Sequence, residues 1–177
     1  HKYVKKAEKV ISELCSMTTW LLPAHDKKKY NITGKQVDID LVSSAVAWQL
    51  TTVINLLKPV IDPQVVKKAE AQILLKVINP FDAMVSGKRH KNWWITGKNN
   101  WNSVCLSNIG GTLLGSNIDQ AKRVRLLEEV IDYSNNFLKG FTKDGYCSEG
   151  TSYWNYGFGY YLQLASALYQ ATNGKLN

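Results

Sequence analysis

The sequence predicts an all-α fold, either a partial (α/α) toroid or an array of helical hairpins. Apolar residues recur at helical spacing along most of the 177 residues, and no segment shows the alternation typical of a strand. Apolar residues make up 45% of the chain, which is enough for a hydrophobic core. The expected helix pairs follow one another about every 40 residues, as in solenoids and toroids. We therefore expect residues 1–177 to form a single helical domain.

The first two helices are predicted from periodicity, a proline and an acidic cap. Apolar positions near a 3.6-residue period indicate a helix over residues 3–21, and Pro23 stops it. A polar loop follows. Either Asp38 or Asp40 can then cap a second helix over residues 41–57, because a carboxylate accepts hydrogen bonds from free backbone N–H groups.

The third helix begins with an acidic cap followed by proline. Asp62 and Pro63 give this signal, since proline is well tolerated in the first helical turn. The helix is expected to end at Asn79-Pro80. Residues 80–100 show no period and are predicted to form a long, basic loop rich in tryptophan, of a length that is often functional.

Two further helices are expected in the middle of the chain. Helical pattern resumes over residues 101–115. Asn117 can cap a long amphipathic helix over residues 118–141, which ends at or near Gly140. Residues 142–150 then form a loop.

The last helix carries an unusual density of tyrosines. It is expected to begin at Thr151 or Ser152. Tyr153, Tyr156 and Tyr160 fall at i, i+3 and i+7, so their side chains share one face. The N-terminus of a helix favours negative charge, which suits a tyrosine in the first turn that gives up a proton.

Residues 88–102 combine basic, aromatic and amide side chains, a mixture that suits an acidic polymer. Indole faces can stack on sugar rings, although tryptophans beside a loop also serve as core packing, and a basic run is often only a solvated face. Glu149, just before the last helix, can cap that helix, hold a lysine or bind a sugar hydroxyl. The candidate binding residues are Lys88, Arg89, Lys91, Trp93, Trp94, Asn99, Trp101, Asn102, Glu149 and Trp154.

Charge and composition narrow the class of partner. The net charge of +8 favours a polyanion, or reflects solubility alone. No run of apolar residues is long enough to cross a membrane, and no nucleic-acid-binding motif is present. The cysteines and histidines have no metal-binding spacing, so neither a metal nor another cofactor is expected. His25 and His90, the only internal histidines, are expected to lie at the surface.

Two motifs together resemble the heparinase II/III-like polysaccharide lyases. They are "NNWNSVC" at residues 99–105 and "DGYCSEGTSYWNYG" at residues 144–157, and the resemblance covers roughly residues 90–170. It implies an (α/α) toroid that cleaves uronic-acid polysaccharides, similar to heparan sulfate or alginate, by β-elimination. It also implies a periplasmic or secreted protein.

The resemblance assigns roles to three residues. Asn100 matches the amide that neutralises the uronate carboxylate, and Tyr153, 53 positions later, matches the proton-transfer tyrosine. Tyr156, one turn further along, is the competing candidate. Members of the family also carry a C-terminal β-sandwich that this sequence lacks, so residues 1–177 are expected to be part of a larger lyase and weakly active or inactive alone. The alternative is a non-catalytic helical module that binds glycans or proteins.

Overall fold

The computed structural model describes residues 2–175, and this part of the chain is all-α and contains no strand, as the sequence predicts. A short 3-10 turn covers Pro23–His25, a π-helical turn covers Leu74–Ile78, and a second 3-10 turn covers Trp93–Thr96. The α-helices are α1 (Lys2–Ser16), α2 (Leu41–Leu57), α3 (Pro63–Ile73), α4 (Asn79–Val85), α5 (Asn100–Gly115), α6 (Gln120–Leu138) and α7 (Thr151–Ala171).

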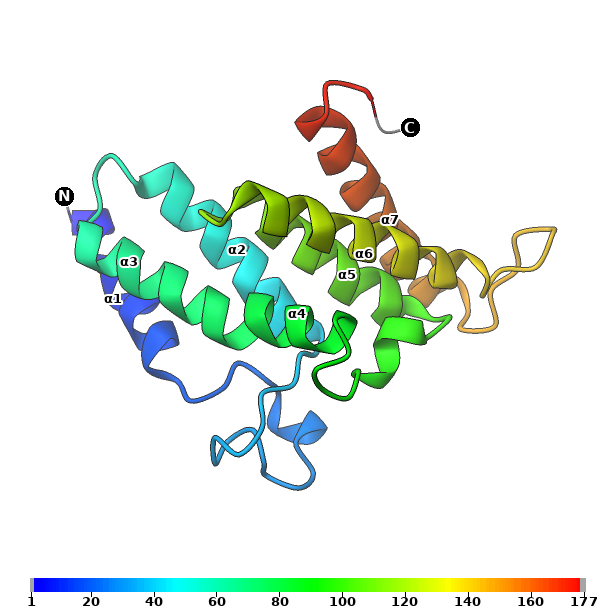
Figure 1. The fold of residues 1–177 in the computed structure, drawn as a ribbon, viewed down its shortest axis with the longest axis horizontal. Coiled ribbons are helices and arrows are strands. Elements are labelled where there is room, and N and C mark those ends of the chain that lie inside the picture. Colours follow the sequence, from blue (N-terminus) through cyan, green and yellow to red (C-terminus); the bar gives the residue numbers. More distant parts are fainter. Residues whose placement is uncertain (1, 176–177) are drawn as a thin grey trace.

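Helix α5 is the centre of the fold and packs against α2, α6 and α7 (Figure 1). It is buried along nearly its whole length, which explains why its apolar residues show no single face. Two adjacent glycines allow the close packing. A Cβ atom on Gly111 would lie 2.1 Å from the Trp48 ring, and one on Gly110 would lie 2.5 Å from Leu164.

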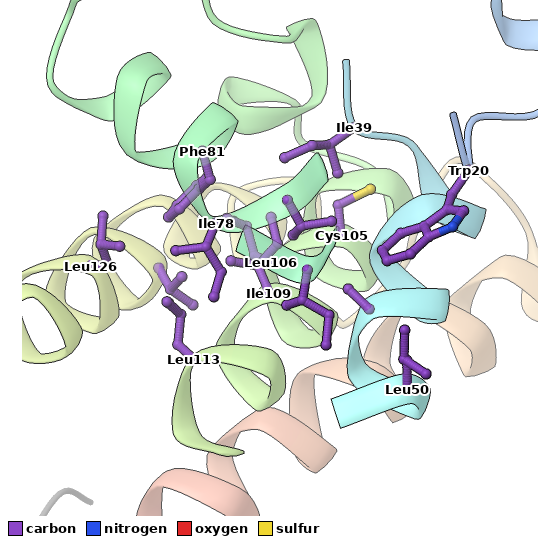
Figure 2. Packing of buried hydrophobic residues seen from close by; sticks show 14 of the residues in the cluster. Trp20, Ile39, Leu50, Ile78, Phe81, Cys105, Leu106, Ile109, Leu113 and Leu126 are labelled. Carbon is purple, nitrogen blue, oxygen red and sulfur yellow. The ribbon is translucent and has the colours of Figure 1, made fainter. Parts of the chain in front are cut away.

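The hydrophobic core surrounds α5 and extends to the first half of the chain. Figure 2 shows Leu106 and Ile109 of α5 close to Ile78 and Phe81, with Leu50 of α2 nearby. No helix within residues 2–175 is both long and apolar enough to cross a membrane.

Acidic residues cap three helices. Asp40 forms a capping box with Ser43, in which its Oδ1 accepts from the Ser43 N–H at 2.7 Å and the Ser43 hydroxyl accepts from the Asp40 N–H. Asp62 caps α3 as expected. The prediction that Asn117 caps the next helix is wrong. Asp119 accepts from the Lys122 N–H, and α6 begins after Asp119.

The helix predicted to stop at Pro80 continues through it. A π-helical turn precedes the proline, and the Asn79 N–H donates to the Leu74 carbonyl five residues back. This widened turn accommodates a residue that has no N–H and whose ring would clash with a regular helical turn. The predicted loop over residues 80–100 is therefore shorter, since α4 and a 3-10 turn occupy part of it. The first helix is also shorter than predicted and ends at Ser16.

Candidate functional site

Glu149 joins the two sequence motifs at the N-terminus of α5. Its carboxylate accepts from the Asn100 backbone N–H at 2.7 Å and from the Asn100 Nδ2 at 2.6 Å. It does not cap α7, which begins after Gly150 and has no side-chain cap. Glu149 thus satisfies one free backbone N–H of a helix that starts 49 residues earlier.

The first turns of α7 lie against the same end of α5. The Ser103 hydroxyl donates to the Gly157 carbonyl at 2.6 Å, and a Cβ atom on Gly157 would lie 3.2 Å from the Asn100 Cα. Asn100 of α5 thus lies beside Gly157 of α7, the helix whose first two turns also carry the candidate tyrosines Tyr153 and Tyr156.

The two tyrosines differ in their surroundings. Tyr153 is 54% exposed, whereas Tyr156 is 39% exposed and packs edge to face on Tyr160, with ring centroids 5.2 Å apart. Burial raises the pKa of the Tyr156 phenol, with smaller contributions from Tyr160 and Cys105. The raised pKa means that the Tyr156 phenol stays protonated at neutral pH, as a phenol ordinarily does, and holds its proton more tightly.

Asn100 itself is only 4% exposed, and its amide faces the Glu149 carboxylate. An amide that binds a sugar carboxylate has to face solvent. In this arrangement the Asn100 amide does not. A sugar carboxylate would have to approach past the negative charge of Glu149, which repels it.

Two predicted binding residues are core residues instead. Trp94 is 1% exposed, and its Nε1 donates to the Ile39 carbonyl at 2.7 Å. Asn102 is fully buried, and its Nδ2 donates to the carbonyls of Trp94, Ile95 and Tyr133. Both side chains fix the turn before α5 and present almost no surface to a ligand.

Trp93 and Trp101 line an open cavity of about 460 Å³ between residues 21–40 and residues 92–101. Their ring centroids are 5.1 Å apart, and Trp101 also contacts His25 edge to face at 4.8 Å. The two segments are joined by the Asn92 side chain, which bonds to Asp38 and to the Ile39 N–H. Residues 21–40 lie below the long helices in Figure 1.

His25 and Asp40 form a hydrogen-bonded pair in the same cavity. The distance from His25 Nδ1 to Asp40 Oδ2 is 2.7 Å, and Asp40 is 1% exposed. The same Asp40 oxygen accepts from the Leu22 N–H at 3.0 Å. His25 is an exposed residue, as the sequence suggested, and its side chain, 29% exposed, is held by a buried carboxylate.

The three basic residues predicted to bind an anion differ in their exposure and in their partners. Arg89 is half-buried, pairs with Asp38 at 3.1 Å and donates to the Val37 carbonyl, so it has a structural role. Lys91 lies 5.5 Å from the centre of the Tyr133 ring. Lys88 is exposed and free to attract an anion.

Trp154 belongs to a second aromatic cluster. It stacks on Phe158 with centroids 5.0 Å apart, contacts Phe141, and donates from Nε1 to the Gly145 carbonyl. It therefore holds the loop of residues 142–150 against α7. Asn99, the residue before α5, has a buried Oδ1 without a hydrogen-bond partner in the described chain.

Sequence reasoning missed the side chains from residues 21–40 that share the cavity with Trp93 and Trp101. They include His25, Lys27, Lys28, Tyr30 and Asp40. The only local signal was the density of basic and aromatic residues in a polar loop. Among residues 2–175, no cluster of three or more metal-binding side chains is present.

Removing the Glu149 carboxylate tests its structural role. Glu149→Ala is expected to lower the free energy of unfolding by about 1.5–3 kcal/mol, the range for hydrogen bonds to a charged group. Urea unfolding followed by circular dichroism measures this change. Asp144→Ala, in the same loop but bonded only within it, is the control and is expected to cost less. An equal effect of the two variants would contradict the role of Glu149.

Comparison with known proteins adds no identification: no family model matches the sequence, and no curated protein is significantly similar to it.

Proposed function

We propose that this chain forms part of the catalytic domain of a polysaccharide lyase. Its substrates are uronic-acid polysaccharides, similar to heparan sulfate or alginate, and its reaction is β-elimination. The observation that carries the proposal is the pair of hydrogen bonds from Asn100 to Glu149, which brings the two lyase-like motifs together. The toroidal architecture, a further β-sandwich domain and a periplasmic or secreted location belong to the same proposal.

The chemistry needs three groups around one sugar ring. A base removes the proton from C5, an acid protonates the glycosidic oxygen as its bond to C4 breaks, and a double bond forms between C4 and C5. A hydrogen-bond donor at the carboxylate stabilises the negative charge that develops there. Tyr156 is the proposed acid, since its phenol carries a proton at neutral pH. Tyr153 is exposed at the same end of α7 and suits proton transfer at the ring.

Asn100 is the proposed donor to the sugar carboxylate. One N–H of its amide is engaged by Glu149. Use of the other N–H requires residues 142–150 to move, because Asn100 is 4% exposed in this structure. Glu149 thus fixes the position of the Asn100 amide and also blocks its access to a ligand.

Replacement of the tyrosines tests the lyase proposal. The full-length protein is assayed on heparan sulfate, heparin and alginate by the ultraviolet absorbance of the unsaturated product. Tyr153→Phe or Tyr156→Phe is expected to lower kcat by about 10²–10⁴-fold, the usual contribution of acid–base catalysis. Tyr169→Phe, at the exposed far end of α7, is the control. Full activity in both variants, or no product from any polymer, would overturn the proposal.

The second candidate is a non-catalytic glycan-binding module, and the burial of Asn100 favours it. An amide that is bonded to Glu149 is not available for the elimination step. This candidate predicts that the protein binds acidic polysaccharides without forming an unsaturated product. The same assay, combined with a binding measurement, separates the two functions.

A further inference from the structure

We infer that the cavity between residues 21–40 and residues 92–101 is a binding subsite for one acidic sugar ring, with Trp93 and Trp101 as its aromatic wall and His25 as its polar contact. The inference depends on the proposed function only for the class of ligand, an acidic glycan. The subsite lies beside the region where α5 and α7 meet, since Trp101 directly follows Asn100 in the chain.

The aromatic wall has the exposure that a sugar platform needs. Trp93 is 58% exposed, unlike its neighbour Trp94, which is 1% exposed and belongs to the core. The Trp93 and Trp101 rings are tilted by 45° with centroids 5.1 Å apart, so together they form an angled surface. Indole rings combine a large apolar area with few rotatable bonds, which lowers the entropy cost of binding a flat apolar face.

The hydrogen bond to Asp40 fixes the orientation of the His25 ring. A carboxylate only accepts hydrogen bonds, so Nδ1 carries the proton in the pair. In neutral His25 the other nitrogen, Nε2, is then an acceptor, and no residue in the described chain donates to it or accepts from it. A sugar hydroxyl is a suitable donor to this nitrogen.

The carboxylates that line the cavity are already engaged by the protein. Asp26 accepts from the Asn31 and Ile32 N–H groups. Asp38 accepts from Asn31, Gln36, Arg89 and Asn92. Asp40 accepts from Leu22, His25 and Ser43. Their charge is therefore partly compensated by these donors.

The lysines of the cavity have no such partner. Lys27 and Lys28 line it, and neither forms an ion pair with another described residue. Lys28 Nζ lies 5.8 Å from the centre of the Tyr30 ring, and Lys35 Nζ lies 6.0 Å from the same ring. These ammonium groups favour a ring that carries a carboxylate or a sulfate over a neutral ring.

The cavity is large enough for one sugar ring. Its volume of about 460 Å³ falls within the range of roughly 300–1,000 Å³ for small-molecule sites. An aromatic wall with a few polar groups is also the usual composition of such sites.

Calorimetric titration tests the subsite with defined probes. Tetrasaccharides from heparan sulfate and from alginate are titrated into the full-length protein, and cellotetraose is the neutral control. Trp93→Ala and His25→Ala are each expected to raise Kd by about fivefold or more, consistent with the loss of one contact. The matched controls Tyr3→Ala and His90→Ala remove exposed side chains outside the cavity and are expected to leave Kd unchanged. Trp93→Ala removes a largely exposed side chain, so its result does not depend on folding.

The outcomes separate the subsite from the lyase proposal. Binding that both variants weaken, without any unsaturated product, supports the subsite and counts against the lyase. Product formation with Kd and KM unchanged in both variants supports the lyase and overturns the subsite. Absence of binding by both acidic tetrasaccharides, or equal binding of cellotetraose, also overturns the subsite.

Discussion

Trp94→Ala is expected to lower the free energy of unfolding by about 3–5 kcal/mol, the range for removal of a large buried aromatic side chain. Trp94 is 1% exposed and is among the largest fully buried side chains in the described chain. The substitution leaves a cavity and also leaves the buried Ile39 carbonyl without its 2.7 Å hydrogen bond. Urea unfolding followed by circular dichroism gives the free energy directly.

The adjacent tryptophan is the matched control. Trp93 is 58% exposed, so Trp93→Ala is expected to change the free energy of unfolding by less than about 0.5 kcal/mol. In a glycan-binding measurement, Trp93→Ala is expected to have the larger effect of the two, because Trp93 lines the cavity as an exposed side chain. If the two substitutions destabilised the protein equally, the assignment of one tryptophan to the core and the other to the cavity would be wrong.

The positions of most helices could be predicted because their signals are local. Asp62 with Pro63 predicts the start of α3, and the start of α7 at Thr151 was also expected. The sequence does not decide whether Asp38 or Asp40 caps α2. The Asp38 side chain instead accepts hydrogen bonds from Arg89 and Asn92. These partners lie more than 50 residues away in the sequence.

The prediction that a helix ends at Pro80 is wrong for a related reason. A proline normally ends a helix, and the local sequence contains no signal for the π-helical turn that accommodates it. Pro80 and its neighbours Ile78 and Phe81 are buried, as is Val77 in the π-helical turn. Packing against the core therefore holds the helix together where the local sequence predicts a break.

The candidate site could be predicted in part. The two motifs indicated that residues near 100 and near 153 lie together. Helices α5 and α7 do pack against each other, with Gly157 beside Asn100, whereas a shared pocket for Asn100 and Tyr153 stays a prediction. The sequence could not show that Glu149 closes off Asn100, since this contact spans 49 residues. Nor could it separate Trp93 from Trp94, because the 3-10 turn that carries both decides which ring faces the core.

Asp40→Ala is expected to lower the free energy of unfolding by about 2–4 kcal/mol, which combines the loss of a helix cap with the cost of leaving buried donors unpaired. Asp40 is 1% exposed and accepts from Ser43, Leu22 and His25. Asp119→Ala is the matched control, because Asp119 caps α6 with a single exposed bond to Lys122 and its loss is expected to cost about 1 kcal/mol.

Asp40→Asn separates the cap from the rest of the network. The amide oxygen can still accept from the Ser43 N–H, so α2 keeps its cap, but the amide nitrogen then faces the Leu22 N–H and the His25 Nδ1. The amide nitrogen repels the Leu22 N–H, and His25 can bond to it only with Nδ1 as acceptor. Nε2 then carries the proton and no longer accepts from a sugar hydroxyl, while the helix remains formed. We expect this variant to unfold at higher urea concentration than Asp40→Ala and yet to bind acidic tetrasaccharides as weakly as His25→Ala does. Binding at the wild-type affinity would show that the carboxylate serves only α2, and that the His25 ring needs no partner to meet its ligand.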